Sequence, residues 1–321
     1  MSRSTKRKPT ALERVEGGLI GLLVGDALGV PYEFHPASEI PAADLIEYQP
    51  PEGFSRAHLG VPPGTWSDDG AQALCLLASL LDRDGLDVED FGRRLQNWYE
   101  FGYLAVDNDV FDVGVTTGLA IAALRAGAPA LEAGPSDTYS NGNGSLMRSL
   151  PLALWHTGPD ARLVEDAFAQ SRVTHGHLRA QVCCGLYCLW ARCWLEDAGD
   201  PWGDATARFR ALFPLESRER EELEWQVRPD EAPSGNGSGY VVDSLRSARL
   251  AMELDSYEGV VRQAIRLGND TDTTACVAGG IAGLRGGVQE IPERWRAQLR
   301  GEALYRPLMD ALKAHLTAAR A

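Results

Sequence analysis

Two short runs of acidic and hydroxyl residues are the places where this sequence could carry out chemistry. The first lies in "GTWSDDGAQAL" and the second in "LGNDTDTTACVAGG", and each comes directly before an apolar stretch. Their oxygen-bearing side chains are those of Ser67, Asp68 and Asp69, and of Asp270, Asp272 and Thr273. One interpretation of each run is a helix cap, because Ser, Thr and Asp accept hydrogen bonds from the first N–H groups of a helix.

The paired acids favour a second interpretation, a metal site. A helix cap needs one oxygen-bearing residue, whereas each run carries two aspartates. If the runs converge, each carboxylate pair at about 4 Å repels by roughly 1 kcal/mol in water and about 4 kcal/mol at an effective dielectric of 20. Carboxylate and hydroxyl oxygens suit hard cations such as Mg²⁺, Mn²⁺ or Ca²⁺, and two divalent ions would offset four aspartates. A separation this long in sequence carries no geometry, so both interpretations stay open at this point.

Further polar residues lie at the ends of other apolar segments. In "GLLVGDALGVPYEF", we expect Asp26 to be a buried helix-end acid that backbone groups satisfy, and Glu33 to be a surface acid or part of a site. The loop 140–145, "SNGNGS", forms either an anion-binding nest before a helix or an ordinary turn. His175 in "VTHGHLRA" is a packed residue or a ligand contact, and Tyr240 can stack on a base.

Composition places the chain among ordinary globular proteins. The 321 residues are 44% hydrophobic, and no apolar run reaches the roughly 18 to 20 residues that span a bilayer, so we expect no transmembrane helix and no membrane partner. The net charge of -14 argues against a general nucleic-acid surface. The start "MSRSTKRKP" is basic and is followed by no signal-peptide segment, which predicts a flexible tail over residues 1–10 and a cytoplasmic protein.

The elements that must position these residues are helices. Apolar residues recur with the helical period through most of the chain, and no run shows the alternation of a half-buried strand, which predicts an all-α fold. The six cysteines lie in apolar helical surroundings, where we expect them to pack in the core. The predicted helices are 11–28, 71–82, 88–101, 113–125, 145–156, 160–172, 178–196, 202–212, 217–225, 241–254, 257–267, 273–284, 293–300 and 301–319.

Seven motifs, taken in order, resemble those of the ADP-ribosylglycohydrolase family, which includes the dinitrogenase reductase-activating glycohydrolase and the ADP-ribosylhydrolases. They are "GLLVGDALGVPYEF", "GTWSDDGAQAL", "FDVGVTTGLAIAAL", "NGNGSLMRSLPLAL", "VTHGHLRA", "GYVVDSLRSA" and "LGNDTDTTACVAGGIAGL". The resemblance covers about residues 14–300. It implies a compact, single-domain, all-α orthogonal bundle over residues 11–321, with a binuclear magnesium or manganese site in a central cleft.

The resemblance also implies roles for residues at matching motif positions. Two divalent cations, Mg²⁺ or Mn²⁺, would be held by the six side chains of the two acidic runs, with Ser67 standing where the family more often has Thr. Glu33 corresponds to a glutamate on a mobile loop near the metals, and Glu33 or Asp69 would exchange protons with water or the leaving group. Asp112 in "FDVG" would touch the group being removed. The substrate contacts would come from Ser140, Gly142, Asn143, Gly144 and Ser145 for the diphosphate and distal ribose, and from His175 for the phosphate side.

The implied activity is hydrolysis of the glycosidic bond at C1″ of an ADP-ribosylated protein or other acceptor, such as ADP-ribosyl-arginine or ADP-ribosyl-serine, with release of ADP-ribose. Two alternatives remain open. A metal-dependent nucleotide phosphoesterase would use the same ions to hydrolyse a bond to phosphorus in place of the glycosidic bond. A non-catalytic ADP-ribose-binding relative would have lost its metal ligands, whereas every ligand position here keeps an oxygen donor.

Overall fold

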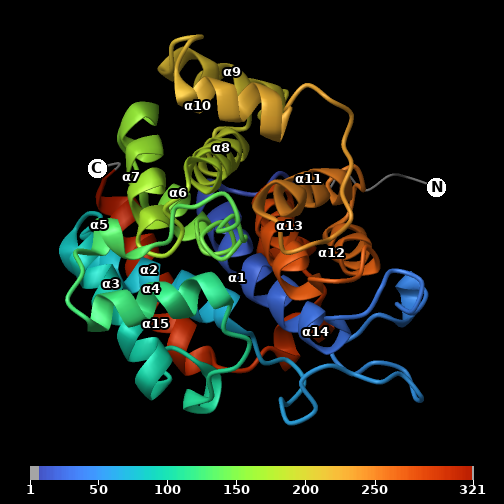
Figure 1. Ribbon diagram of the computed structural model, residues 1–321. Helices are drawn as coiled ribbons and strands as arrows, with labels where there is room; N and C mark the ends of the chain where they lie inside the picture. Colours follow the sequence, from blue (N-terminus) through green and yellow to red (C-terminus); the bar gives the residue numbers. More distant parts are fainter. Residues whose placement is uncertain (1–6, 320–321) are drawn as a thin grey trace.

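Helices account for the regular structure of residues 7–319, the part of the chain that the computed structural model describes (Figure 1). Within those residues there is no strand, only two isolated β-bridges, Pro36 with Gly268 and Gly142 with Tyr240. The all-α prediction is therefore confirmed. The α-helices are α1 (Ala11–Gly29), α2 (Asp68–Arg83), α3 (Val88–Phe101), α4 (Val115–Arg125), α5 (Ala130–Ala133), α6 (Leu150–Trp155), α7 (Asp160–Arg172), α8 (Leu178–Leu195), α9 (Pro201–Leu212), α10 (Arg218–Glu221), α11 (Val241–Ala251), α12 (Tyr257–Arg266), α13 (Thr271–Gly286), α14 (Glu293–Gln298) and α15 (Glu302–Ala318).

The five shorter segments complete the element order. They are the 3₁₀ turns η1 (Val30–Tyr32), η2 (Ala43–Leu45), η3 (Val106–Asn108) and η5 (Val288–Glu290), and the π-helical turn η4 (Glu222–Val227).

Helices α1 and α13 pack against each other at the centre of the molecule (Figure 1). Glycines recur every four residues along α1, at positions 17, 21, 25 and 29. A Cβ atom at Gly25 would lie 2.1 Å from the carbonyl oxygen of Ala275, and one at Gly29 would lie 2.3 Å from the Cα of Asp272. Two backbones can approach this closely only where one side chain is absent. The glycine spacing thus places the end of α1 against the first turn of α13, where the second acidic run lies.

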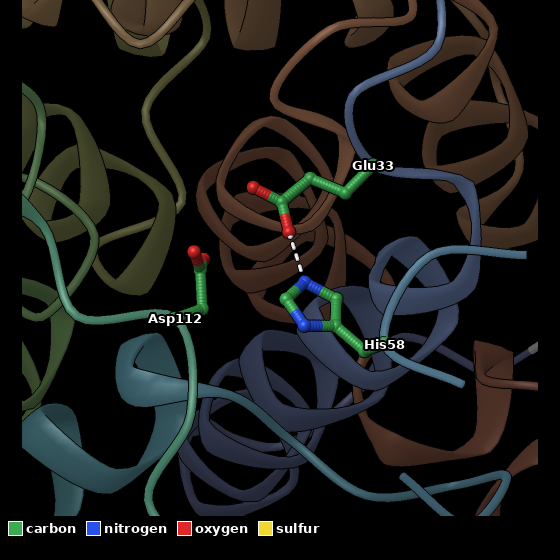
Figure 2. A group of neighbouring side chains, drawn as sticks. All are labelled: Glu33, His58 and Asp112. Carbon is green, nitrogen blue, oxygen red and sulfur yellow. Dashed lines mark hydrogen bonds and ion pairs between the residues drawn. The ribbon is translucent and has the colours of Figure 1, made fainter. Parts of the chain in front are cut away.

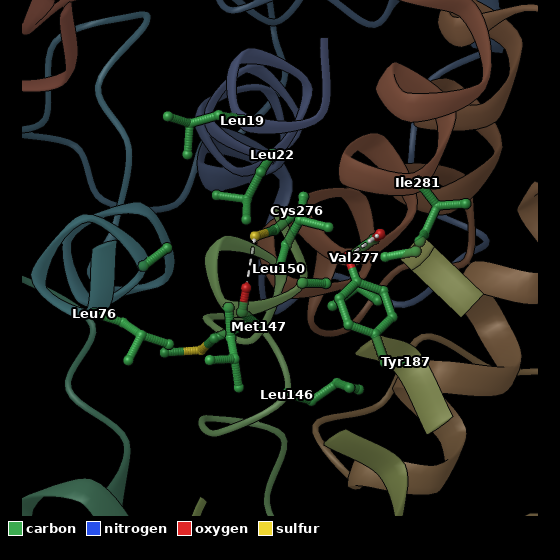
Figure 3. Packing of buried hydrophobic residues seen from close by; sticks show 14 of the residues in the cluster. Leu19, Leu22, Leu76, Leu146, Met147, Leu150, Tyr187, Cys276, Val277 and Ile281 are labelled. Carbon is green, nitrogen blue, oxygen red and sulfur yellow. Dashed lines mark hydrogen bonds between the residues drawn. The ribbon is translucent and has the colours of Figure 1, made fainter. Parts of the chain in front are cut away.

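The core around this helix pair is apolar and closely packed. Figure 3 shows Leu22 of α1 and Met147 on opposite sides of Cys276, whose thiol donates to the carbonyl oxygen of Met147 at 3.6 Å. Tyr187 of α8 donates its hydroxyl to the carbonyl oxygen of Val277 at 3.0 Å, which satisfies a buried polar group inside the core. All six cysteines are buried and free, so the prediction that they pack in the core is confirmed.

One predicted helix is wrong over its first five residues. The segment 145–149 forms turns, and α6 begins only at Leu150. Pro151 explains the difference, because a proline inside a continuous 145–156 helix would remove a backbone hydrogen bond, whereas at the first helical positions its missing N–H costs nothing. The predicted helix 217–225 also divides, into α10 and the π-helical turn η4.

The N-terminal segments bear on two other predictions. By length and composition, Ala11–Tyr32 could cross a membrane, but 94% of its most apolar window is buried inside the protein, and core helices of soluble proteins pass the same test. Residues 1–6 of the predicted tail lie outside the described part of the chain. In the remainder, Arg7 and Lys8 form ion pairs with Glu13 and Asp197.

Candidate active site

The two acidic runs meet in one cleft. The hydroxyl of Thr273 donates to Asp69 Oδ1 at 3.2 Å, which joins two residues that are far apart in the sequence. The cleft has a volume of about 210 Å³. Its lining includes Glu33, Asp68, Asp69, Asp112, Gly142, Asn143, Gly144, His175, Asp270 and Thr273.

The first acidic run is positioned by the start of α2. Ser67 is the N-cap residue, and its hydroxyl accepts the N–H of Asp69 at 3.3 Å. Asp26 of α1 lies beneath this turn and accepts the N–H groups of Ser67 at 2.9 Å and Gly70 at 2.7 Å. Burial raises the pKa of Asp26 to about 7, and these backbone donors oppose part of the shift. The expectation that backbone groups satisfy Asp26 is confirmed, and its carboxyl group fixes the first acidic run to α1.

The second acidic run does not behave as an ordinary helix cap. Asp270 occupies the N-cap position of α13 but makes no side-chain capping hydrogen bond. Its Oδ2 instead accepts from Asn143 Nδ2 at 2.8 Å. The hydroxyl of Thr271 donates to the carbonyl oxygen of Gly29 at 2.8 Å and fixes this turn to α1. Helix capping therefore explains the presence of Ser67 but does not explain that of Asp270.

Three buried carboxylate oxygens in the cluster lack a hydrogen-bond partner among the described residues. They are Asp69 Oδ2, Asp270 Oδ1 and Asp272 Oδ2. A buried polar atom without a partner is costly and rare in folded proteins. Glu33, Asp270 and Asp272 also offer oxygen atoms that all lie within 4.8 Å of one another. The residues present therefore fit hard divalent cations, which prefer oxygen ligands of this kind.

The electrostatics of the cluster agree with that fit. Burial raises the pKa values of Asp68, Asp69 and Asp272 well above the usual range, and neighbouring carboxylates raise them further. Burial also raises the pKa of Asp270, although the hydrogen bond from Asn143 opposes the shift. Bound positive charge would favour the ionised forms of all four aspartates.

Glu33 comes from the segment that follows η1, and its side chain faces Asp112 across the cleft (Figure 2). It is only 4% exposed, so it is not a surface acid. Its Oε2 lies 2.6 Å from His58 Nε2. Burial, followed by the charge of Asp112, raises the pKa of Glu33 to about 10, and burial, followed by Asp270, raises that of Asp112 to about 6.

The Glu33 segment is fastened to the second acidic run in this structure. The N–H of Phe34 donates to the carbonyl oxygen of Asn269 at 2.7 Å, and the N–H of Asn269 donates to that of His35 at 2.6 Å. The β-bridge between Pro36 and Gly268 continues this pairing. The resemblance implies a mobile loop here, and in this structure the loop is paired with the segment before α13.

The glycine-rich loop contributes the middle of the "SNGNGS" segment to the cleft. Gly142, Asn143 and Gly144 line it, but Asn143 donates its N–H to the carbonyl oxygen of Gly239 at 3.1 Å, so that N–H is not free for an anion. Ser145 is fully buried beneath the loop, where its hydroxyl lies 2.9 Å from that of Ser171, and Ser140 donates to Asp137. Neither serine side chain is part of the cleft lining. Because α6 begins only at Leu150, no helix N-terminus directly follows the loop.

The remaining two predicted substrate residues differ in position. His175 is buried in the cleft wall, with Nδ1 at 2.8 Å from the Thr174 hydroxyl, and burial lowers its pKa to about 3, which keeps the imidazole neutral. Tyr240 lies outside the acidic cleft, in an adjoining hollow of about 560 Å³. Tyr240 is 38% exposed, and its hydroxyl accepts a hydrogen bond from Arg179 at 3.0 Å. Its neighbour Gly239 lines the acidic cleft, so the two hollows adjoin.

Two residues near the cleft were not identified from the sequence as candidate site residues. His58, described above, bonds to Glu33, and Arg148 is fully buried behind the first acidic run. Arg148 donates to Gln72 Oε1 at 2.8 Å and to the carbonyl oxygen of Gly144 at 3.2 Å, while Gln72 donates to Asp68 Oδ2 at 2.9 Å. Arg148 thus supplies positive charge behind the acids. The sequence feature that could have identified Arg148 is its position as a single charged residue in the apolar run "SLMRSLPL".

Comparisons with known proteins agree with this geometry. The sequence model of the ADP-ribosylglycohydrolase family matches residues 7–321. The ADP-ribosyl-[dinitrogen reductase] glycohydrolase of Rhodospirillum rubrum is 30% identical over 311 residues, which cover 95% of this chain and 97% of that protein. The ADP-ribosylarginine hydrolase Tri1 of Serratia proteamaculans is 28% identical over 295 residues, which cover 90% of this chain and 76% of that protein.

A solved structure gives the same result for the fold. A chain described as "ADP-ribosylglycohydrolase-related protein complex" superposes with a TM-score of 0.74 at 32% sequence identity, covering 95% of this chain and 98% of its own. The family match over nearly the whole chain, these relatives and the acidic cleft all lead to one conclusion: the chain belongs to the ADP-ribosylglycohydrolase family.

Proposed function

We propose that this chain removes ADP-ribose from modified arginine side chains with the help of two divalent cations, Mg²⁺ or Mn²⁺. Family membership makes it a glycohydrolase of ADP-ribosyl linkages. The observation that carries the rest is the group of buried carboxylate oxygens without partners in the cleft. Such oxygens are stabilised by bound cations, and the acidic wall of the same cleft suits a cationic acceptor.

The residues that would hold the ions are Ser67, Asp68 and Asp69 from the start of α2 and Asp270, Asp272 and Thr273 from the start of α13. When bound, the ions would supply an orienting charge for ribose hydroxyls and a water of lowered pKa. Ser67 Oγ accepts the Asp69 N–H and keeps a second lone pair for a ligand role.

Glu33 is the group best placed to move a proton. In the overall reaction the bond from C1″ to the arginine nitrogen breaks, the water oxygen joins C1″, and one water proton passes to the leaving nitrogen. Burial and nearby acids raise the pKa of Glu33 to about 10 in the metal-free protein, and bound cations would lower it from there, so its carboxyl group would be able to give up a proton to that nitrogen. Asp69 is the second candidate for proton transfer, because its Oδ1 already accepts a hydrogen bond from Thr273.

Asp112 supports arginine as the acceptor. Its carboxylate lines the cleft opposite Glu33 (Figure 2), where it can accept two N–H groups of a guanidinium. A serine acceptor offers no charge for such a pair. One relative, Tri1, is named for hydrolysis of ADP-ribosylarginine.

The remainder of the substrate would extend past Gly239. The cleft volume of about 210 Å³ is small beside the roughly 300 to 1,000 Å³ of most ligand pockets. The loop residues Gly142 to Gly144 and the neutral imidazole of His175 would face the diphosphate, and Tyr240 would stack on the base in the adjoining hollow. Ser140 and Ser145 would support this loop from behind.

The test compares acceptors. Proteins carrying ADP-ribosyl-arginine or ADP-ribosyl-serine are incubated with the enzyme and Mg²⁺, and released ADP-ribose is measured by chromatography. We expect release from arginine, and about a tenfold to hundredfold loss of arginine turnover in Asp112→Asn, because one charge-assisted pair is lost. Asp109→Asn, a change at an exposed neighbour, is the control. Release from serine alone would contradict the arginine assignment, and formation of AMP in place of ADP-ribose would indicate a phosphoesterase.

A further inference from the structure

We propose that His58 is a positioning residue for Glu33, whose imidazole holds the glutamate side chain inside the cleft. The proposal rests on the function proposed above for Glu33. His58 does not itself line the cleft, so it would act on the reaction only through the carboxyl group that it contacts.

The contact between the two residues is close and shielded from water. His58 Nε2 lies 2.6 Å from Glu33 Oε2, and the two side chains are 13% and 5% exposed. At this distance a single proton lies between the two atoms, whichever of them carries it. Figure 2 shows the carboxyl group of Glu33 directly beside the ring of His58, with Asp112 to the left of both.

A holding group is needed because the carboxyl group of Glu33 is buried. The residue is only 4% exposed, and oxygen atoms of Glu33, Asp270 and Asp272 lie within 4.8 Å of one another. A buried polar side chain gains by turning out to solvent unless a hydrogen bond retains it. His58 is the residue that makes this bond in the described part of the chain.

The ring of His58 itself contacts two other aromatic rings. Its centroid lies 5.5 Å from that of Phe34, the residue after Glu33, and 5.1 Å from that of Phe111, the residue before Asp112. His58 therefore contacts the two chain segments that carry the facing acids of the cleft. These aromatic contacts fix the orientation of the imidazole, which is what a positioning role requires.

The backbone at this junction is in a conformation that needs such support. Phe34, His58 and Asp112 have φ angles of 64°, 50° and 56°, in the left-handed region that non-glycine residues rarely adopt. Strained residues of this kind cluster at functional sites, where the surrounding contacts maintain them. Three separate segments, each with one such residue, thus meet at the imidazole of His58.

The test separates the hydrogen bond from the ring packing. His58→Phe keeps an aromatic ring between Phe34 and Phe111 but has no polar atom, whereas His58→Gln can place its amide nitrogen near the position of Nε2. We expect the Phe variant to lower kcat for the ADP-ribosylated substrate by about tenfold or more with KM changed by less than about threefold, and the Gln variant to recover most of kcat. His315→Phe, at a histidine that stacks on Trp155, is the control.

Two results would overturn the proposal. One is equal kcat in His58→Phe and the wild type. The other is a Gln variant as slow as the Phe variant, since recovery by an amide donor is what a purely structural role would not produce. Combining His58→Phe with Glu33→Gln should lower kcat no further than Glu33→Gln alone, because both changes act on one group.

A measurement without substrate keeps the proposal testable if the proposed function is wrong. In thermal unfolding, the Tm changes of His58→Phe and Glu33→Gln should be non-additive, as expected for residues in contact. Non-additive Tm changes in a protein that releases no ADP-ribose would reject the proposed function but retain the contact. Additive Tm changes would reject the positioning role itself.

Discussion

Replacing Asp272 by Asn should stabilise the metal-free protein, which is the opposite of what most changes at fully buried residues do. Oxygen atoms of Asp272, Asp270 and Glu33 lie within 4.8 Å of one another. Two unit charges at that distance repel by about 3.5 kcal/mol at an effective dielectric of 20. Protonation relieves part of this repulsion, because the pKa values of these acids are raised, so we expect a net gain of about 1 to 3 kcal/mol at pH 8. The amide oxygen of Asn can still accept the N–H of Thr273, which Asp272 Oδ1 accepts now.

The assay is thermal unfolding at pH 8, first in a chelator and then in Mg²⁺. At roughly 2 °C per kcal/mol for a chain of this size, Asp272→Asn should raise the Tm of the metal-free protein by about 2 to 6 °C. The wild type should gain about 2.7 kcal/mol when Mg²⁺ is present at about 100 times its Kd, and the variant should gain little or nothing.

Asp90→Asn is the matched control. Asp90 is also a buried aspartate, at 5% exposed, but it forms ion pairs with Arg83, Arg93 and Arg94. Burial raises its pKa, but the hydrogen bonds from Arg94 and Arg83 outweigh burial and hold the pKa below the usual range. Its replacement should lower the Tm and leave the response to Mg²⁺ unchanged, because it leaves paired cations without their anion. The reasoning is refuted if Asp272→Asn lowers the Tm in chelator, or if the variant still responds to Mg²⁺ as the wild type does.

Two further predictions concern pH and the glycine-rich loop. Burial lowers the pKa of His156 to about 4, and its Nδ1 accepts from Gly158 and Arg192, so below about pH 6.5 the unfolded chain binds a proton that the folded chain does not. The stability that His156 contributes should therefore be complete above pH 6.5 and fall by about 2 kcal/mol between pH 6.5 and 5, measured as the difference in unfolding free energy between the wild type and His156→Gln; a constant difference would contradict the shift. In Gly144→Ala, the new Cβ would lie 2.8 Å from His175 Cε1, so ADP-ribose affinity measured by calorimetry should fall by about tenfold or more. Gly118→Ala, whose Cβ meets nothing within 4 Å, should bind as the wild type, and equal binding by both variants would place the ligand elsewhere.

The parts of the fold that were predictable from the sequence are those governed by local pattern. Helical periodicity predicts the helices because each turn buries its own apolar face. The two aspartates in each acidic run predict a repulsion between carboxylates that helix capping does not explain. The glycine spacing on α1 is also visible in the sequence, but its partner is not. That α13 lies against these glycines follows only from the folded structure.

The contacts of His58 and Arg148 show where prediction from sequence ends. His58 lies outside all seven motifs, and Arg148 lies inside one that gives no sign of its role. Each acquires its partner only when distant segments meet: His58 with Glu33, and Arg148 with Gln72. The segment 145–149 fails for a different reason. Its apolar spacing is helical, but one proline decides where the helix begins. The position of the Glu33 segment likewise depends on pairing with Asn269, far away in the sequence.

The need for divalent cations is tested by the release of ADP-ribose from a protein carrying ADP-ribosyl-arginine, measured before and after metal removal. We predict release in Mg²⁺ or Mn²⁺, loss of release after chelation, recovery when the ion is restored, and no recovery in Asp270→Asn, whose Oδ1 lacks a partner among the described residues. Release that persists unchanged in chelator, or in Asp270→Asn, would contradict the account.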